Sequence, residues 1–407
     1  MRIRVGDISK INELSLLKND SFDTILYLDT SNLTENKVDT LQKIDLSIDK
    51  LPSRAKRKVR KNTILFSNVR PIQRHYGLLE ETPNNLIVST GFTTLNPDDS
   101  VIDEYFLYYL LTQDSTINYL QMIAENSVSS YPSITSNDIA DLNFVIPDSI
   151  EEQKRTVKII KLIDQKISLN NQINEELEAM AKTLYDYWFV QFDFPNENGK
   201  PYKSSGGKMV YNDQLKREIP EGWGVKQLGE LSTYVTDKIS SNDLNSKNYI
   251  GTDNMLSNMK GIEQATYLPN STLVNSFIPN DILIANIRPY FKKIWISDRT
   301  GGCSSDVLCL RANDKEICNY LFYSLARDDF FNYNVAGSKG SKMPRGDKAH
   351  IQKYSVLFSE KHALKFSKLV SNFISQKHLI YKQNQELTQL RDWLLPMLMN
   401  GQVKVEE

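Results

Sequence analysis

The sequence predicts an α+β protein. Two tandem mixed α/β domains are joined by two long antiparallel helices, which form a coiled-coil rod with approximate internal two-fold symmetry. Three observations predict this fold. The halves of the 407-residue chain repeat one another, each half contains short apolar runs, and each half ends in a long helix with a heptad-like seam. We expect domains at 1–149 and 223–360, helices at 150–190 and 361–401, and a linker at 191–222.

The repeat is clearest in the phrase TILFSNVRP at 63–71, which recurs as DILIANIRP at 281–289. Other pairs follow in the same order: VGDIS with LGELS, YLDTSNL with YIGTDNM, YFLYYLLTQDSTINY with NYLFYSLARDDFFNY, and NEEL with NQEL. Pro132 likewise matches Pro344. Collinear matches of this kind indicate a tandem duplication of a unit of roughly two hundred residues, which is too long a period for a solenoid.

Within each repeat, short apolar runs predict buried strands. TILFSNV and DILIANI end at an Arg-Pro pair, and LIVST and VLCLR have the same character. The aromatic-rich stretch from Asp103 to Met122 predicts one helix, whose rings pack inside the domain. The segment at 191–222 is rich in Gly, Pro, Asn, Ser and Lys, so we expect an extended linker there.

The first long helix is expected from about Ile150 to Val190, after a capping box formed by Ser149 and Glu152. Its seam consists of Ile160, Ile163, Ile167, Asn170, Asn174, Leu177, Ala181, Leu184 and Trp188. A second stripe lies beside the seam at Ile159, Leu162, Leu169, Ile173 and Met180. Asn174 is equivalent to Asn384 in the repeat, and polar seam residues of this kind either set helix register or simply face solvent.

The second long helix is expected from about Leu364 to Asn400, with Pro396 kinking or fraying its last turn and Gly401 ending it. Its matching seam is Val370, Phe373, Ile380, Leu387, Leu394 and Leu398. Two such helices at equivalent places in a duplicated chain should pack on each other. The first helix leads the chain from one domain to the other, so the second must return antiparallel to it.

Several kinds of chemistry find no support in the sequence. There is no phosphate-binding loop, no glycine-rich dinucleotide turn and no amino-methyltransferase motif. Asp148, Glu152 and Lys154 resemble a nuclease metal set, but their spacing at a helix start favours a cap with first-turn acids. We therefore expect a non-catalytic chain with no bound metal and no cofactor of its own.

Composition agrees with a protein of the reduced cytoplasm. The three cysteines lack CxxC spacing, and four scattered histidines argue against a structural zinc site. No membrane span or secretory signal is expected. The formal net charge is −1, so any nucleic-acid binding must depend on local positive charge or on partner subunits.

Positive charge is concentrated in two places. The run SRAKRKVRK immediately precedes the repeated strand, and its cations are suited to DNA phosphates: Arg54, Lys56, Arg57, Lys58, Arg60 and Lys61. The alternative is an ordinary solvated loop. The second place is the Gly/Ser-rich loop from Ala336 to Lys348, which carries Lys339, Lys342 and Arg345.

The duplication suggests how to sort the remaining binding residues. Arg70 and Arg288 occur in both repeats, so they are expected to belong to the framework or to contact phosphate at any target. Target-reading residues should lie in unmatched loops at 34–62, 73–84, 127–133, 256–280, 290–302 and 337–348. The expected base contacts are Arg74, His75, Tyr76, Tyr290, Lys292 and Lys293.

Five segments give the chain a family resemblance: IPDSIEEQKRTVKIIKLIDQKI from Ile146, LYDYWFVQFDFP from Leu184, YKSSGGKMVYND from Tyr202, IPEGWGVKQLGEL from Ile219 and ELTQLRDWLLPMLMNGQV from Glu386. With the repeat, they cover essentially the whole chain. The sequence resembles the specificity subunit of Type I restriction–modification systems.

The resemblance implies two target-recognition domains that each read half of a split double-stranded DNA sequence, with the helices setting the spacer. It also implies docking of two methylation subunits, which carry S-adenosylmethionine, and of restriction subunits that use ATP and Mg²⁺. Aromatic residues of the helices are the expected docking contacts: Tyr185, Tyr187, Trp188, Phe189 and Trp393. Packing of these rings against the domains or linker is the alternative. A scaffold that bridges two identical proteins without touching DNA is the competing function.

Overall fold

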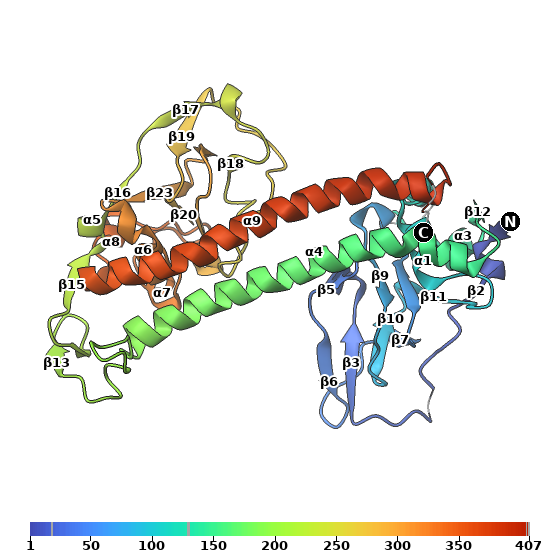
Figure 1. The fold of residues 1–407 in the computed structure, drawn as a ribbon, viewed down its shortest axis with the longest axis horizontal. Helices are drawn as coiled ribbons and strands as arrows, with labels where there is room; N and C mark the ends of the chain where they lie inside the picture. Colours follow the sequence, from blue (N-terminus) through green and yellow to red (C-terminus); the bar gives the residue numbers. More distant parts are fainter. Residues whose placement is uncertain (18, 128–130, 404, 406–407) are drawn as a thin grey trace. The chain divides into compact units, whose positions relative to one another are not determined.

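The computed structural model describes residues 1–17, 19–127, 131–403 and 405. The chain forms two compact units. Unit 1 comprises Met1–Leu169 and Asn384–Glu407, and unit 2 comprises Asn170–Gln383. Both long helices therefore contribute one part to each unit (Figure 1).

The core of unit 1 is built on a four-stranded antiparallel sheet whose order is β2 (Ser9–Ile11), β11 (Phe92–Pro97), β8 (Thr63–Ser67) and β9 (Tyr76–Leu79). Every residue of β8 is buried, as the apolar run predicts for a strand covered on both faces. A second sheet has the order β6 (Gln42–Asp45), β3 (Thr24–Leu28), β10 (Leu86–Ser89) and β7 (Ala55–Lys58). Two short pairs are β1 (Arg2–Arg4) with β12 (Asn143–Val145), and β4 (Leu33–Thr34) with β5 (Lys37–Val38).

The single helix predicted from Asp103 to Met122 is wrong, because the chain forms two helices there. These are α1 (Glu104–Thr112) and α2 (Asp114–Glu125), separated by Gln113 in an extended conformation. The burial of the two helices differs. From Phe106 onward α1 is buried all round, whereas α2 buries only one face, so a change of direction lets both fit the core. The short helix α3 (Ser136–Ala140) follows.

Unit 2 repeats the strand order of the central sheet. Its central sheet is β16 (Ser232–Tyr234), β23 (Val307–Ala312), β20 (Ile282–Ala285) and β21 (Ile294–Ile296). Its second sheet is β17 (Lys238–Ser240), β19 (Leu273–Phe277), β22 (Gly301–Cys303) and β18 (Tyr249–Ile250). The strand pair β15 (Gly224–Gln227) with β24 (Ser355–Phe358) and the helices α5 (Leu228–Leu231), α6 (Cys318–Leu325), α7 (Asp328–Ala336) and α8 (Lys348–Gln352) complete it.

The extended linker predicted at 191–222 is also wrong. The segment contains a hairpin of β13 (Met209–Asn212) and β14 (Arg217–Pro220), and it packs on unit 2. Phe192 and Phe194 are buried in the core of unit 2 together with Trp223, and the Phe194 and Trp223 rings stack at 4.9 Å. The few aromatic residues therefore outweigh the polar composition of the segment, because each buries a large apolar surface.

The predicted long helices are confirmed. α4 (Ile150–Tyr185) continues into one π-helical turn (Asp186–Val190), and α9 (Glu360–Met399) runs through Pro396 without ending there (Figure 1). Most of the predicted seam is buried or half-buried, and Asn170 is buried within it. In unit 2, the Asn170 amide donates to Gln383 Oε1 at 2.9 Å, and Lys377 Nζ lies 2.6 Å from Glu178 Oε2. These two pairs fix an antiparallel alignment.

The same helix pair is tied together by charge in unit 1, where Arg391 Nη1 lies 3.2 Å from Asp164 Oδ1. Tyr109 of α1 donates to the other oxygen of Asp164 at 2.7 Å, which links the pair to the core of the unit. In the described part of the chain, no helix combines the length and hydropathy that a bilayer crossing requires.

Candidate nucleic-acid interface

The repeated phrase folds into the same turn in both units. After β8, Arg70 takes a left-handed conformation (φ 47°, ψ 72°), Pro71 begins the 3-10 helix η3 (Pro71–Gln73), and Arg74 is left-handed again. After β20, Arg288 (φ 50°, ψ 62°), the 3-10 helix η6 (Pro289–Phe291) and Lys292 repeat this pattern. Left-handed backbone is uncommon outside glycine, and two such residues four apart make a specific, strained turn.

Each turn is hydrogen-bonded to a loop that the sequence predicts to read the target. In unit 1 the Arg70 N–H donates to the Pro132 carbonyl at 3.0 Å, and the Ile134 N–H donates to the Asn68 carbonyl at 2.8 Å. Of the predicted loop 127–133, residues 128–130 lie outside the described residues. The structure therefore brings a shared turn and an unmatched loop together, which sequence order alone does not reveal.

Unit 2 has the equivalent bonds. The Arg288 N–H donates to the Pro344 carbonyl at 2.8 Å, and the Gly346 N–H donates to the Asn286 carbonyl at 3.1 Å. Lys339 and Arg345 exchange two backbone hydrogen bonds of 2.9 Å, so the loop closes as a small hairpin. Lys342 lies exposed at its tip.

The two shared arginines are open to solvent. The Arg70 guanidinium lies 5.9 Å from the centre of the Tyr131 ring, close enough for a cation–π contact. The structure gives the Arg288 side chain no hydrogen bond or ion pair with any described residue. Both therefore remain available to phosphate or to base edges.

The base contacts predicted in unit 1 are less open. Arg74 is paired with Asp114 at 2.6 Å and Glu35 at 3.4 Å, and His75 Nδ1 lies 2.7 Å from the Leu33 carbonyl oxygen. Tyr76 is buried in the core, and burial raises its pKa to about 12. The prediction of Tyr76 as a base contact is therefore wrong, because β9 turns this ring inward against Phe66.

In unit 2, Tyr290 is exposed with its ring 4.8 Å from that of Phe291. Lys292 is paired with Asp328 at 2.7 Å, and Lys293 donates to the Thr252 carbonyl at 2.6 Å. These lysines lie beside the shared turn, but both are already engaged within the unit.

The middle of the basic run forms the strand β7 (Ala55–Lys58), and the residues on either side of it are turns or irregular. In β7, Lys58 is paired with Asp20 at 2.8 Å, and Arg57 is half-buried with its pKa lowered by that burial. The β7 strand lies between β10 and the segment at 14–16. The remaining cations of the run are exposed, and these are Arg54, Lys56, Arg60 and Lys61.

The loop from Ala336 to Lys348 is partly neutralised. Lys339 forms an ion pair with Asp347, which lowers the pKa of that carboxyl to about 2. Arg345 Nη2 lies 3.0 Å from Asp306 Oδ1. Of the three predicted cations, Lys342 alone has no ion pair among the described residues.

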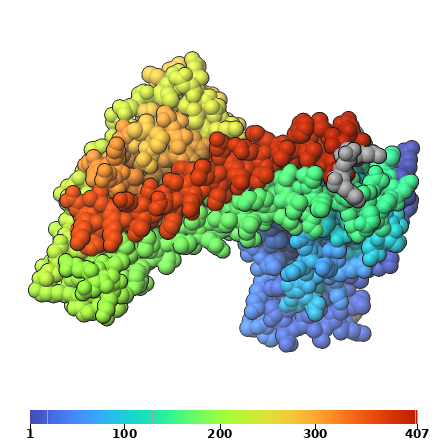
Figure 2. Space-filling view, viewed as in Figure 1, coloured from blue at the N-terminus to red at the C-terminus, as the bar shows by residue number. Residues whose placement is uncertain are grey.

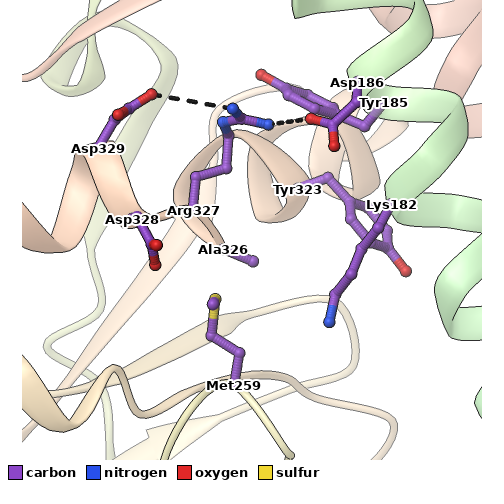
Figure 3. Close-up of a pocket in the computed structure, with 9 residues that line it drawn as sticks. All are labelled: Lys182, Tyr185, Asp186, Met259, Tyr323, Ala326, Arg327, Asp328 and Asp329. Atoms are coloured by element: carbon purple, nitrogen blue, oxygen red, sulfur yellow. Dashed lines mark hydrogen bonds and ion pairs between the residues drawn. The ribbon is translucent and has the colours of Figure 1, made fainter.

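A cavity of about 270 Å³ in unit 2 is a separate feature (Figure 3). Tyr185, Lys182 and the first turn of α7 line it, and Arg327 forms ion pairs with Asp186 and Asp329. Asp328 on its wall is paired with Lys292. Because its charges are largely paired with one another, this cavity is a poor phosphate site.

The predicted docking aromatics divide into two groups. Tyr185, Trp188 and Phe189 are buried in the core of unit 2, so their prediction as exposed contacts is wrong. The alternative, that these rings pack against the domain, is confirmed. Trp393 is exposed. Tyr187 is half-buried on a mainly apolar groove of about 550 Å³, together with Met180, Leu184 and Phe373.

The resemblance to a nuclease metal set is not reflected in the geometry. Asp148 pairs with the amino group of Met1 at 2.5 Å, and Lys154 pairs with Glu151 at 3.3 Å. Gln153, which lies between Glu152 and Lys154 in the sequence, is buried and donates to the Pro147 carbonyl at 3.0 Å. Among the described residues, no three His, Cys, Asp or Glu side chains gather as a metal site.

Sequence reasoning missed the exposed apolar side chains beside the shared arginines. Ile72 lies two residues after Arg70, and Tyr131 and Met343 each precede the proline that accepts from the arginine N–H. The match of Pro132 with Pro344 in the repeat is the sequence signal that would have located Tyr131 and Met343.

Comparison with known proteins identifies related chains. Residues 2–179 match the Type I restriction modification DNA specificity domain. The Type I restriction enzyme HindI specificity subunit of Haemophilus influenzae is 24% identical over 465 residues, covering 98% of each chain. The MjaIX specificity subunit of Methanocaldococcus jannaschii is 28% identical over 85% of this chain and 79% of its own.

A crystal structure has a similar fold. The S subunit of a Type I restriction–modification system from M. genitalium superposes with a TM-score of 0.55 at 15% identity, covering 98% of this chain and 95% of that one. At this identity the likeness concerns the fold.

Proposed function

The chain belongs to the family of Type I restriction–modification specificity subunits, and we propose that it recognises the DNA sequence for such a complex. The match of residues 2–179 to the DNA specificity domain carries this proposal. In this role the chain is not an enzyme. It directs the methylation and cleavage that other subunits perform.

Each unit would read one half of a split target. The shared turn with Arg70 or Arg288 supports this, because an exposed arginine on a rigid backbone suits a phosphate contact that any sequence offers. The loops bonded to the two turns differ in sequence, SVSSYPS at 127–133 against GSKGSKMPRGDK at 337–348. Different loops on a common frame would give two different half-sites.

The paired helices would dock two methylation subunits and set the length of the unread spacer. Apolar side chains stay exposed on α4 and α9 beside the buried seam, and these are Ile159, Leu162, Leu169, Met180, Leu379, Tyr381, Leu390 and Trp393. Side chains of α9 (red) lie at the surface in Figure 2. Exposed apolar residues along a helix are typical of protein interfaces. The apolar groove beside Tyr187 would belong to this interface.

Because the two units repeat the same central sheet and the same turn, equivalent surfaces on them would meet equivalent partners. S-adenosylmethionine would be bound by the methylation subunits, and ATP with Mg²⁺ by the restriction subunits. The assembled complex would therefore hold all of the catalytic chemistry.

Methylome sequencing of the host with and without the gene tests this function. We expect one bipartite adenine-methylation motif to disappear on deletion and to return when the gene is restored. Retention of every adenine motif in the deletion strain, with the methylation subunits still expressed, would contradict the proposal.

A further inference from the structure

In each unit an exposed arginine stands in a turn that carries one exposed, largely apolar side chain, and the turn is bonded to a loop that carries a second. In unit 1 these side chains are Ile72 (49% exposed) and Tyr131 (64%), and the Tyr131 ring centre lies 5.9 Å from the Arg70 guanidinium. In unit 2 the arginine is Arg288, and the side chains are Tyr290 (48%) and Met343 (52%). The positions are equivalent, since the first apolar residue comes two after the arginine and the second comes directly before the proline bonded to the arginine N–H.

The backbone beneath these side chains is fixed. Left-handed residues stand before and after each 3-10 turn, and the arginine N–H is bound to the facing loop. In unit 1 the Ile72 N–H also donates to Gln121 Oε1 at 3.2 Å. A strained backbone that recurs in both units, with exposed apolar tips, is a feature that folding alone does not require.

We propose that each of these apolar pairs is a wedge that inserts at a base step in the minor groove, while the arginine of the same turn enters the groove or holds its phosphates. This inference rests on the proposed function. Minor-groove proteins combine apolar wedges with arginine in this way, and the wedge partly unstacks and kinks the duplex. A kink adds sequence preference at flexible steps that no side chain reads directly.

DNA is the occupant that the charge of this surface favours. Tyrosine, methionine and arginine also occur at protein interfaces, so it is the cation without an anionic partner in the described part of the chain that favours DNA. Arg288 has no anionic partner among the described residues, and a phosphate backbone supplies one. The cations Arg74 and Lys292 occupy the same place at the end of each turn.

The two wedges differ in size. After Tyr290, unit 2 presents the partly exposed Phe291, whose ring packs against Tyr290 at 4.8 Å. Unit 1 has Gln73 at that position. An aromatic pair covers more of a base face than an aliphatic chain, so unit 2 should unstack its half-site more strongly.

The test uses the complex of this chain with its methylation subunits, and DNA that carries 2-aminopurine at successive steps of each half-site. Binding should raise the fluorescence at one step per half-site away from the target adenine, since an adenine methyltransferase flips that base out of the stack itself. In Y290A/M343A the rise should be lost in the unit 2 half alone, and in I72A/Y131A in the unit 1 half alone. Val145→Ala and Tyr211→Ala, which change residues elsewhere that are at least as exposed, should keep both signals.

Tight binding of unmodified complex with no fluorescence rise at any step would overturn the wedge while leaving DNA recognition intact. Loss of subunit assembly in the wedge variants, seen by size-exclusion chromatography, would instead assign the surface to protein docking and also overturn it. Failure of the proposed function is distinguishable, since the methylation motif would then survive deletion of the gene.

Discussion

The Asn170 side chain on α4 donates a hydrogen bond of 2.9 Å to Gln383 on α9, from a position that is almost wholly buried. A polar residue in an apolar seam favours the register in which its bond is made. We expect Asn170→Ala to lower the free energy of unfolding by about 1–2 kcal/mol, because a buried hydrogen bond is removed. Urea denaturation followed by circular dichroism measures this. The exposed neighbour Ser168→Ala is the control, and equal stability of the two variants would contradict a structural role.

Phe189 and Trp393, both predicted as docking contacts, should have different roles because one is buried and the other is exposed. Phe189 is buried among Tyr185, Tyr320 and Phe366, so Phe189→Ala should lower the free energy of unfolding by about 3–5 kcal/mol. Trp393→Ala should leave stability nearly unchanged and weaken binding of the methylation subunits instead. Thermal unfolding and titration calorimetry distinguish the effects, and a stable F189A with weakened assembly would reverse our assignment.

The exposed part of the basic run should contribute to DNA affinity through phosphates. Changing Arg54, Lys56, Arg60 and Lys61 to Gln should weaken binding and reduce the slope of log K against log salt by about 0.9 for each phosphate that is no longer neutralised. Lys58→Gln is the matched control, because Lys58 is already paired with Asp20. Gel shifts of the assembled complex over a range of salt measure both the affinity and the slope. An unchanged slope in the fourfold variant would exclude the basic run from the interface.

Stability in unit 2 should fall in mild acid because of His362. This ring packs 4.2 Å from Phe194 and 5.0 Å from Trp223, and burial lowers its pKa to about 4. The unfolded state, with a pKa near 6.5, takes up the proton first, so this contribution is complete above pH 6.5 and is lost as pH falls toward 4. The ring is half-buried, and we expect an effect on the order of 1 kcal/mol.

Comparing the pH dependence of thermal unfolding for the natural protein and His362→Phe isolates this contribution. The difference between the two proteins should change between pH 6.5 and pH 4 and stay constant above that interval. A constant difference over the whole range would show that His362 keeps an ordinary pKa in the folded state.

The three cysteines should resist thiol reagents in the native state. Cys303, Cys309 and Cys318 are all buried, and burial raises the pKa of Cys303 to about 12 and that of Cys318 to about 11. We expect negligible reaction of the folded protein with a colorimetric disulfide reagent at pH 8. In guanidinium chloride, three thiols per chain should react. Rapid reaction of any thiol in native protein would show that unit 2 opens locally.

The sequence by itself determined the repeated architecture. Local apolar patterns predict the strands β8 and β20 and the helices α4 and α9. Those patterns depend only on the period of a strand or helix. Comparing the two repeats also located the Arg70 and Arg288 turns. Most of the frame could therefore be derived before any tertiary structure was known.

The tertiary structure decided which side chains are free to act. Tyr76 and Phe189 are buried, although the sequence predicts both as exposed contacts. Phe194 packs in the core of unit 2, so the segment predicted as a linker belongs to that unit, and the helix predicted from Asp103 is interrupted at Gln113. It also bonded the loops that carry Tyr131 and Met343 to the turns of the shared arginines, although each residue lies more than fifty residues from its arginine in the chain. Burial and proximity depend on residues distant in sequence, and no local pattern records which of them will meet.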